Sequence, residues 1–172
     1  MMSARLKRRL FVNGIAAATA GAGIAALAPA LAANIEAGQR APALDIKLLN
    51  GKTLTAKQLQ GKVVVYMYWA TWCPYCRADL PEMQRIYQLL QPKGLEILAL
   101  SIDENNKTVR DFWKGKNYSF PAAMRSNAYF EHYGRIGTTP TYLIVDREGI
   151  LRQRINGAPE PGVIEQLVAK LL

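Results

Sequence analysis

Cysteine and histidine are scarce in this sequence, which has two cysteines and one histidine among 172 residues. A structural zinc site needs four ligands, mostly cysteine sulfur or histidine nitrogen, so the chain could build one only by sharing the metal with a second copy. We therefore expect no metal and no cofactor. Hydrophobic residues make up 50% of the chain and charged residues 20%, which is typical of a globular domain rather than a disordered chain.

Basic runs are also few, although the net charge is +9. Four of the positive charges, and no acid, fall in residues 1–32, which leaves +5 for residues 33–172. In that part lysines and arginines alternate with acids, and no basic run is interleaved with aromatic residues. Nucleic-acid binding is therefore not favoured. A mildly basic surface suits either an acidic partner or anionic lipid, or it is simply a solvated surface.

The N-terminus has the features of an export signal. Residues 1–32 combine a basic start, an Ala/Gly-rich apolar stretch and Ala-Leu-Ala at positions 30–32, a cleavage-site pattern. Arg8-Arg9 resembles the twin-arginine signal, with Asn13 where that signal usually has lysine. An uncleaved membrane anchor is the alternative, but a span needs about 20 apolar residues. Either interpretation places the domain outside the cytoplasm, in the periplasm or another extracytoplasmic compartment.

After this segment, residues 33–43 are predicted to be an exposed lead-in and residues 44–172 to form one domain. Apolar runs that alternate with helical periodicity predict an α/β fold: a mixed sheet with helices on both faces. Asn50-Gly51 predicts a tight hairpin turn. The predicted strands are 44–48, 53–55, 62–69, 95–102, 119–123, 141–145 and 150–155, and the predicted helices are 74–91, 109–116, 127–133 and 163–172.

Both cysteines lie in the stretch WATWCPYCRADLPEM, directly after the strand predicted at 62–69. A purely structural disulfide is possible in an exported protein, but so short a loop would add only about 2 kcal/mol. A peroxide-reducing cysteine is another possibility. The peroxiredoxin pattern requires a threonine or serine three residues before the thiol, where this chain has Ala70.

Redox exchange is the interpretation that explains the spacing. At the start of a helix, residues three apart share one face, close enough for an S–S bond. The free amides and the helix dipole stabilise a thiolate on Cys73 and lower its pKa, which makes it the nucleophile. Cys76 would then resolve the mixed disulfide. Pro74 suits the first helical position, because an amide hydrogen has no partner there.

WATWCPYCRADLPEM, together with the later stretch GTTPT at 137–141, resembles the active-site segments of TlpA/ResA-like proteins. These are exported thiol-disulfide oxidoreductases of the thioredoxin fold, and they include the reductants of cytochrome c maturation. The resemblance covers nearly all of residues 33–172 and implies a thioredoxin fold with an N-terminal hairpin and a central βα insertion. It also implies that Pro140 is cis and lies opposite the disulfide, so that Thr139 offers its backbone to an extended substrate peptide.

The resemblance further marks the neighbours of the cysteines. Asp79 stands where ResA-like proteins carry a glutamate that tunes the cysteine pair, although an acid in the first turn of a helix also favours the dipole by itself. Pro74-Tyr75 matches the dipeptide between the cysteines of glutaredoxins, and Trp72 is expected to cover the disulfide as an apolar platform. Trp69 is expected to be a core residue at the end of its strand. Trp113 and Tyr118 are expected in the core or at its rim, and His132 on the surface of a short helix; no chemical role is predicted for these last three.

The function predicted from these features is disulfide reduction in protein substrates, in cytochrome c maturation or a similar envelope pathway. A membrane thiol donor would recharge the pair, since no third cysteine can store electrons. The direction of electron flow is not encoded in the motif, because about 1.4 kcal/mol already moves the couple by about 30 mV. The alternatives are a disulfide oxidase, a thiol peroxidase and a non-catalytic peptide-binding module.

Overall fold

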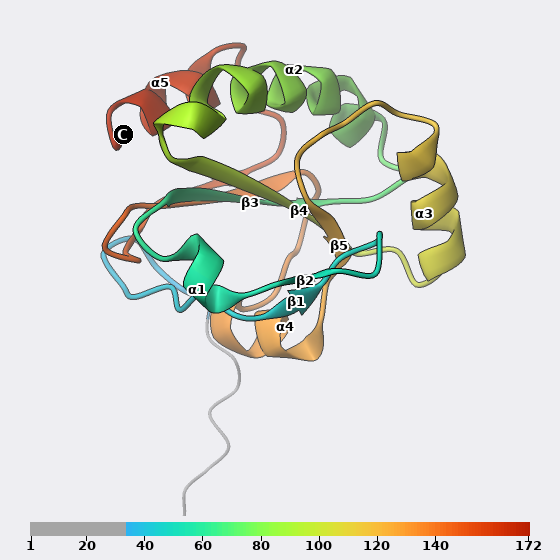
Figure 1. Cartoon of the computed structure of the whole chain (residues 1–172), viewed down its shortest axis with the longest axis horizontal. Helices are drawn as coiled ribbons and strands as arrows, with labels where there is room; N and C mark the ends of the chain where they lie inside the picture. Colours follow the sequence, from blue (N-terminus) through green and yellow to red (C-terminus); the bar gives the residue numbers. More distant parts are fainter. Residues whose placement is uncertain (1–33) are drawn as a thin grey trace, which may run out of the picture. The chain divides into compact units, whose positions relative to one another are not determined.

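The computed structural model describes residues 34–172 of the chain (Figure 1). Their centre is a five-stranded sheet in the order β5-β4-β3-β6-β7. The central strand β3 (Val63–Trp69) pairs in parallel with β4 (Leu95–Ser101) and antiparallel with β6 (Thr141–Val145). The outer strands are β5 (Ala122–Met124), parallel to β4, and β7 (Leu151–Asn156), antiparallel to β6. The mixed sheet predicted from the sequence is confirmed.

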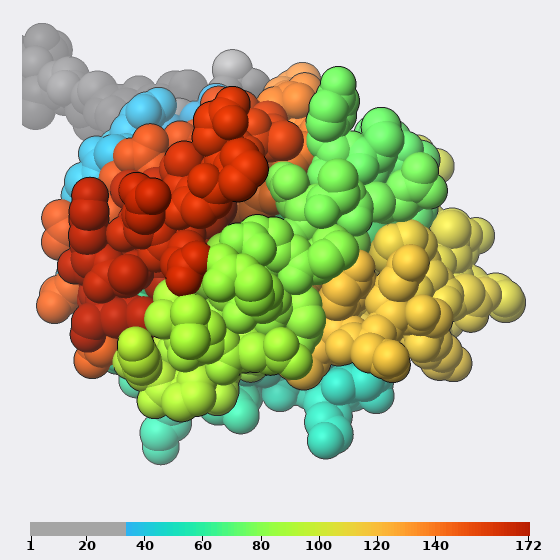
Figure 2. Space-filling view, turned by 90° about the horizontal axis from the view of Figure 1, so that it is seen from above, coloured from blue at the N-terminus to red at the C-terminus, as the bar shows by residue number. Residues whose placement is uncertain are grey.

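Helices cover both faces of this sheet. On one face α2 (Pro74–Leu90) and α5 (Val163–Ala169) lie side by side, as the green and red surfaces of Figure 2 show. Helix α3 (Asn106–Lys114) lies beyond the β5 end of the sheet. The other face carries the remaining elements, which are the hairpin β1 (Ile46–Lys47) and β2 (Thr53–Leu54), α1 (Ala56–Leu59) and α4 (Asn127–Tyr133).

The side chains of β3 divide between two cores. Its odd-numbered residues, from Val63 to Trp69, pack with buried residues of α2 and α5. Its even-numbered residues, from Val64 to Tyr68, pack with α4 and the hairpin. Because successive side chains of a strand point to opposite faces, covering both faces buries the whole strand. This is the physical reason for the continuous apolar run in the sequence.

Short elements differ most from the prediction. Helix α1 was not predicted, yet the sequence carries its capping box, in which the Gln58 side chain accepts from the Thr55 amide over 2.8 Å. Helix α3 starts at Asn106, three residues before the predicted 109, with Asn105 as its cap. Such boundaries depend on capping side chains rather than on apolar periodicity. The 3-10 turn Gln91–Lys93 follows α2 and ends at Gly94, whose φ of 106° closes the segment.

The described part of the lead-in is less exposed than predicted. Ile35 and Ala41 are buried, and the Gly38 amide donates to the Leu151 carbonyl over 2.8 Å. This stretch therefore packs against β7, because the apolar side chains gain by leaving water. The predicted export signal or anchor at 1–32 lies outside the described residues. Among residues 34–172, no helix is long and apolar enough to cross a membrane.

Candidate functional site

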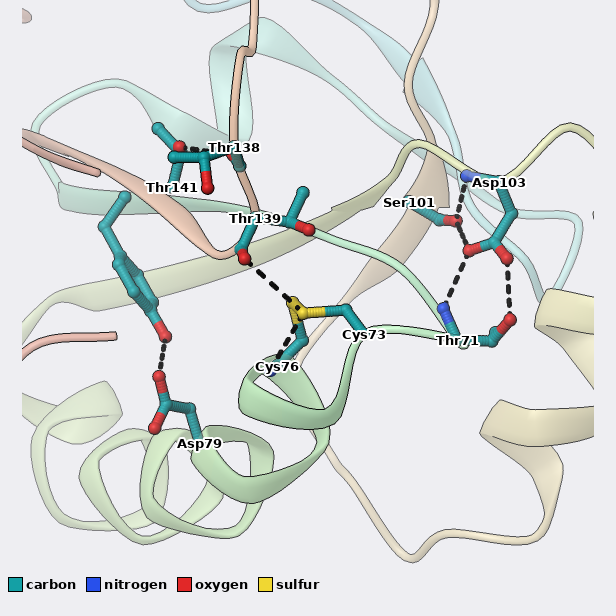
Figure 3. Close-up of a disulfide and its surroundings, with 10 residues drawn as sticks. Thr71, Cys73, Cys76, Asp79, Ser101, Asp103, Thr138, Thr139 and Thr141 are labelled. Atoms are coloured by element: carbon teal, nitrogen blue, oxygen red, sulfur yellow. Dashed lines mark hydrogen bonds between the residues drawn. A yellow bond between two sulfur atoms is a disulfide. The ribbon is translucent and has the colours of Figure 1, made fainter. Parts of the chain in front are cut away.

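The two cysteines lie where the chain leaves β3 and enters α2. Cys73 is the N-cap of α2, and its sulfur accepts a hydrogen bond of 3.2 Å from the Cys76 amide. Pro74 occupies the first turn, as predicted. Cys73 and Cys76 form a disulfide with 5.3 Å between their Cα atoms (Figure 3). An amide hydrogen and the positive end of a helix therefore both act on the Cys73 sulfur.

The disulfide is buried, whereas its aromatic neighbours in the sequence are not. Cys73 is 2% exposed and Cys76 is 0% exposed. Trp72 and Tyr75 are 65% and 67% exposed, which makes them two of the three large exposed hydrophobic residues among those described. Exposed aromatic surface next to a reactive group is typical of a surface that contacts a partner. The surface beside the buried disulfide is therefore aromatic and accessible.

The segment before β6 faces the disulfide from across the site. The Thr139–Pro140 peptide bond is cis, as the resemblance implied. The Thr139 carbonyl oxygen lies 3.5 Å from the Cys73 sulfur. In the disulfide that sulfur carries no proton, so this is a contact; a reduced Cys73 thiol can donate a hydrogen bond to the same oxygen. Two hydrogen bonds hold the segment, from the Thr141 hydroxyl to the Thr138 carbonyl and from the Gly157 amide to the Pro140 carbonyl, both 2.8 Å.

Asp79 lies in the second turn of α2, not in the first turn as expected from the sequence, because the helix begins at Pro74. Its carboxylate is turned toward β6 (Figure 3). The Tyr142 hydroxyl donates to it over 2.7 Å. Burial raises the pKa of Asp79 above its ordinary value of 3.8, the tyrosine hydrogen bond lowers it in part, and the nearby Glu82 raises it further. The carboxylate lines a pocket of about 230 Å³ between α2 and α5, together with Glu82 and Glu160. The structure thus gives Asp79 an interaction with Tyr142 that the sequence did not predict.

Asp103 supports the loop that leads to Cys73, and sequence analysis missed it. One of its oxygens accepts from the Thr71 amide at 2.9 Å and from the Ser101 hydroxyl at 2.7 Å. The other accepts from the Thr71 hydroxyl at 2.6 Å. An available signal was the position of this acid two residues after the end of β4, because the carboxyl ends of neighbouring parallel strands meet at one edge of a sheet. Asp103 fixes the backbone two residues before the first cysteine.

The remaining aromatic candidates belong to the core or pack against it, since Trp69 is buried and Trp113 and Tyr118 are partly buried. Trp69 is fully buried, as predicted, and its ring centre lies 5.3 Å from that of Trp113. Tyr118 continues this cluster, 5.2 Å from Trp113. His132 lies exposed on α4, as predicted. Within residues 34–172, no group of three or more His, Cys, Asp or Glu side chains could hold a metal ion.

Comparison with known proteins agrees with this geometry. The model of the Redoxin family matches residues 36–171. The chain belongs to the Redoxin family. It is 33% identical to the thiol-disulfide oxidoreductase ResA of Bacillus thuringiensis subsp. konkukian over 138 residues, 80% of this chain and 79% of the relative. It is 27% identical to ResA of Bacillus subtilis over 131 residues, 76% of this chain and 73% of that protein.

A solved structure with the same fold is the thiol:disulfide interchange protein, a thioredoxin family protein, from Chlorobium tepidum. It aligns with a TM-score of 0.72 at 22% identity, covering 81% of this chain and 99% of the other. The thioredoxin fold predicted from the sequence is confirmed. The family, the ResA relatives and the Cys73–Cys76 pair identify this redoxin as a thiol-disulfide oxidoreductase of the ResA type.

Proposed function

We propose that this redoxin is an exported disulfide reductase, in which Cys73 attacks disulfides of other proteins and Cys76 completes the exchange. The observation that carries the proposal is the position of the Cys73 sulfur between the Cys76 amide at 3.2 Å and the Thr139 carbonyl at 3.5 Å. The amide and the helix dipole stabilise a thiolate, which is the reactive form. The carbonyl opposes the negative charge and favours the protonated thiol.

This balance bears on the direction of exchange. A strongly stabilised thiolate makes the reduced protein stable and the disulfide form a strong oxidant. A carbonyl oxygen against the same sulfur reduces that stabilisation and so favours electron donation. We therefore expect a reduction potential below about −150 mV, and a value well above it would indicate an oxidase instead.

The reaction begins with the reduced pair. The Cys73 thiolate attacks one sulfur of the substrate disulfide, an S–S bond forms between protein and substrate, and the other substrate sulfur leaves as a thiolate that takes up a proton. The Cys76 thiolate then attacks the Cys73 sulfur and releases the second substrate thiol. The substrate gains two electrons and two protons, and the protein is left with the Cys73–Cys76 disulfide.

Substrate positioning follows from what surrounds the sulfurs. Thr139 is half-buried, next to the buried Pro140, and its backbone can pair with an extended peptide. Trp72 and Tyr75, which adjoin the cysteines in the sequence, provide exposed apolar surface. Asp79, together with Pro74 and Tyr75, would tune the pKa of the pair. Because the Asp79 carboxylate accepts a hydrogen bond from Tyr142, it would influence the cysteines either while this hydrogen bond is present or after the bond has broken.

The cellular setting is the part of the proposal that depends on the N-terminal sequence. The export pattern of residues 1–32 favours an extracytoplasmic, periplasmic location with 44–172 as the catalytic domain. A membrane thiol donor would return electrons to the disulfide, since the sequence has no third cysteine. Cytochrome c maturation is the pathway we propose, because the active-site segments resemble the reductants that serve it.

The contacts of Thr71 favour disulfide exchange over peroxide reduction. Its hydroxyl is the nearest one before Cys73 in the sequence, and it donates to Asp103 over 2.6 Å. A hydroxyl committed to a carboxylate does not offer its proton to a peroxide at the sulfur.

Trapping tests the proposal directly. In a Cys76→Ser variant the second step cannot occur, so substrate proteins should stay linked to Cys73 as mixed disulfides that dithiothreitol releases. Cys73→Ser is the matched control and should trap none. Identification of the trapped proteins by mass spectrometry tests the pathway, with apocytochrome c expected among them. Recovery of only unlinked Cys76→Ser protein from cells would contradict the assigned roles, and a pure binding module would keep its partners in the Cys73→Ser variant.

A further inference from the structure

A groove with two arginines adjoins the segment that faces the disulfide. Its volume is about 280 Å³, and we call it the arginine groove; its lining residues are Asn34, Arg135, Gly137, Thr138, Arg154 and Asn156. Thr138 directly precedes Thr139, whose carbonyl lies 3.5 Å from the Cys73 sulfur. The groove therefore begins one residue away from the backbone group that touches the sulfur.

The positive charge of the groove is not balanced by its lining. The Arg154 guanidinium donates to the Arg135 carbonyl at 2.9 Å, the Tyr133 carbonyl at 3.3 Å and the Asn156 side-chain oxygen at 3.4 Å. All three acceptors are neutral. The ion pairs found within residues 34–172 involve other cations, namely Lys62, Arg85, Lys107 and Arg152. Arg135 is exposed, so an incoming carboxylate can reach it without displacing an acid.

The hydrogen bonds of Arg154 also make the groove a fixed feature. They tie β7 to the end of α4 and to the segment after it, so the guanidinium is held in place before a ligand arrives. A preorganised guanidinium loses less side-chain entropy on binding and can meet a carboxylate with two parallel hydrogen bonds. Arg135 can add a second positive charge at the exposed rim.

We infer that the arginine groove selects substrates that carry an acidic side chain close to the cysteine under attack. This inference rests on the proposed function, because it assumes that a peptide lies along Thr139. An extended peptide advances about 3.3 Å per residue and alternates its side chains between two sides. With the target sulfur at Cys73, a side chain one or two residues along the peptide reaches the groove beside Thr138. Charge complementarity makes aspartate or glutamate the side chain that fits.

The second pocket near the site has the opposite charge. It is lined by Asp79, Glu82 and Glu160 and shares no residue with the arginine groove. An acidic side chain placed there would meet like charge. The two pockets therefore favour one direction of the bound peptide, with its acidic side toward Arg135 and Arg154. The expected partner is an acidic stretch of a protein around a cysteine, rather than an acidic protein in general.

Single-turnover exchange with matched peptides tests the inference. The purified full chain is first reduced, so that its own dithiol supplies the two electrons. It is then mixed with peptide disulfides that are identical except for glutamate, glutamine or lysine beside the cysteines. Acid quenching and alkylation, followed by mass spectrometry, give the rate constant of protein oxidation. Each rate is divided by the rate at which dithiothreitol reduces the same peptide, which removes the intrinsic effect of the flanking charge.

Charge-reversal variants separate the groove from the overall charge. Arg135→Glu removes a groove cation whose side chain makes no hydrogen bond within residues 34–172, where only its backbone carbonyl accepts one, from Arg154. Lys57→Glu changes the net charge by the same amount on exposed α1. Helix α1 lies before the start of β3, and the cysteines lie after its end. The length of β3, about 20 Å, therefore separates the control position Lys57 from the disulfide. Asp79→Asn tests the opposite pocket.

At low salt we expect the glutamate peptide to react at least about threefold faster than the lysine peptide, and high salt to reduce the difference. Arg135→Glu should abolish or invert the preference, and Lys57→Glu should keep it. Equal corrected rates in the wild type would overturn the inference, and so would an equal loss of preference in Lys57→Glu. If reduced protein reacts with neither peptide, the proposed reductase function fails. The preference for the glutamate peptide is then measured as the amount of each peptide linked to Cys73 in the Cys76→Ser variant. Equal amounts of the glutamate and lysine peptides would overturn the inference.

Discussion

The hydroxyl of Tyr142 donates a 2.7 Å hydrogen bond to the carboxylate of Asp79 and so links β6 to α2 within the site. Tyr142 follows Pro140 by two residues, and Asp79 follows Cys76 by three. The bond therefore joins the two segments that face each other across the disulfide. Burial raises the pKa of Asp79, the hydrogen bond from Tyr142 lowers it in part, because a donor stabilises the carboxylate, and Glu82 raises it further.

Replacing Tyr142 with phenylalanine should raise the pKa of Asp79 further. The variant keeps the ring and removes only the hydroxyl that lowers the pKa, so burial and Glu82 act unopposed. A ¹³C NMR titration of the Asp79 carboxyl in both proteins measures the change. Tyr87→Phe is the matched control, since its hydroxyl bonds to Glu96 instead, and it should leave Asp79 unchanged. An unchanged or lower pKa in Tyr142→Phe would show that the bond does not form in solution.

Asp79 should make the protein less stable as the pH rises. The pKa of Asp79 in the folded protein lies above its ordinary value of 3.8, which applies to the unfolded chain. At a pH between the unfolded and the folded pKa, the folded state therefore holds a proton that the unfolded state has released. The stability of the wild type relative to Asp79→Asn should thus decrease from about pH 3.8 upward and become constant above the folded pKa. Urea unfolding across about pH 3 to 8 measures this difference.

Glu82 supplies a comparison of opposite sign. Its pKa is lowered below 4.5, first by the hydrogen bond from Arg85. The stability that it contributes is present above pH 4.5 and is lost as the pH falls through the folded pKa. Relative to Glu82→Gln, the wild type should therefore gain stability with rising pH over this range. A slope of the wrong sign for either carboxylate would contradict the assignment made for that residue.

Asp103→Ala should destabilise the loop that carries the first cysteine. Three donors lose their acceptor, two on Thr71 and one on Ser101, in bonds that are partly buried. A hydrogen bond to a charged group contributes about 1.5 to 3 kcal/mol. The free energy of unfolding should fall by roughly that amount, and the Thr71 amide should exchange faster with deuterium. Asp111→Ala, which removes an exposed acid from α3, should change neither quantity noticeably. Unaltered exchange at Thr71 would indicate that the loop is held by other contacts.

Leu80→Ala should cost about 2 to 5 kcal/mol of unfolding free energy, because it leaves a cavity in the core that supports the cysteine helix. Leu80 is 0% exposed and lies one turn after Cys76. Leu89→Ala serves as the control on the same helix, since Leu89 is 49% exposed and its loss should cost much less. Urea denaturation of the oxidised proteins compares the two, and similar midpoints would argue against tight packing beneath the disulfide.

Local sequence pattern predicted most of the fold and the position of both cysteines at the start of a helix. The strand at 63–69, the helix from Pro74 and the tight turn at Asn50-Gly51 follow from residue types and spacings within a few positions. The capping box at Thr55 was equally local and could have been read. By contrast, the docking of Ile35 and Ala41 could not be predicted, since it depends on what β7 presents to them.

The sequence by itself determined the pairing of Cys73 with Cys76 at a helix start, because three residues make almost one helical turn wherever the helix lies. Only the tertiary structure decided which distant residues surround the disulfide and its supporting loop. Thr71 bonds to Asp103 across 32 positions, Asp79 to Tyr142 across 63, and the Thr139 carbonyl reaches Cys73 across 66. Such contacts follow from the order of strands in the sheet, which is selected by the packing of the whole core and is not encoded in the residues near any one partner.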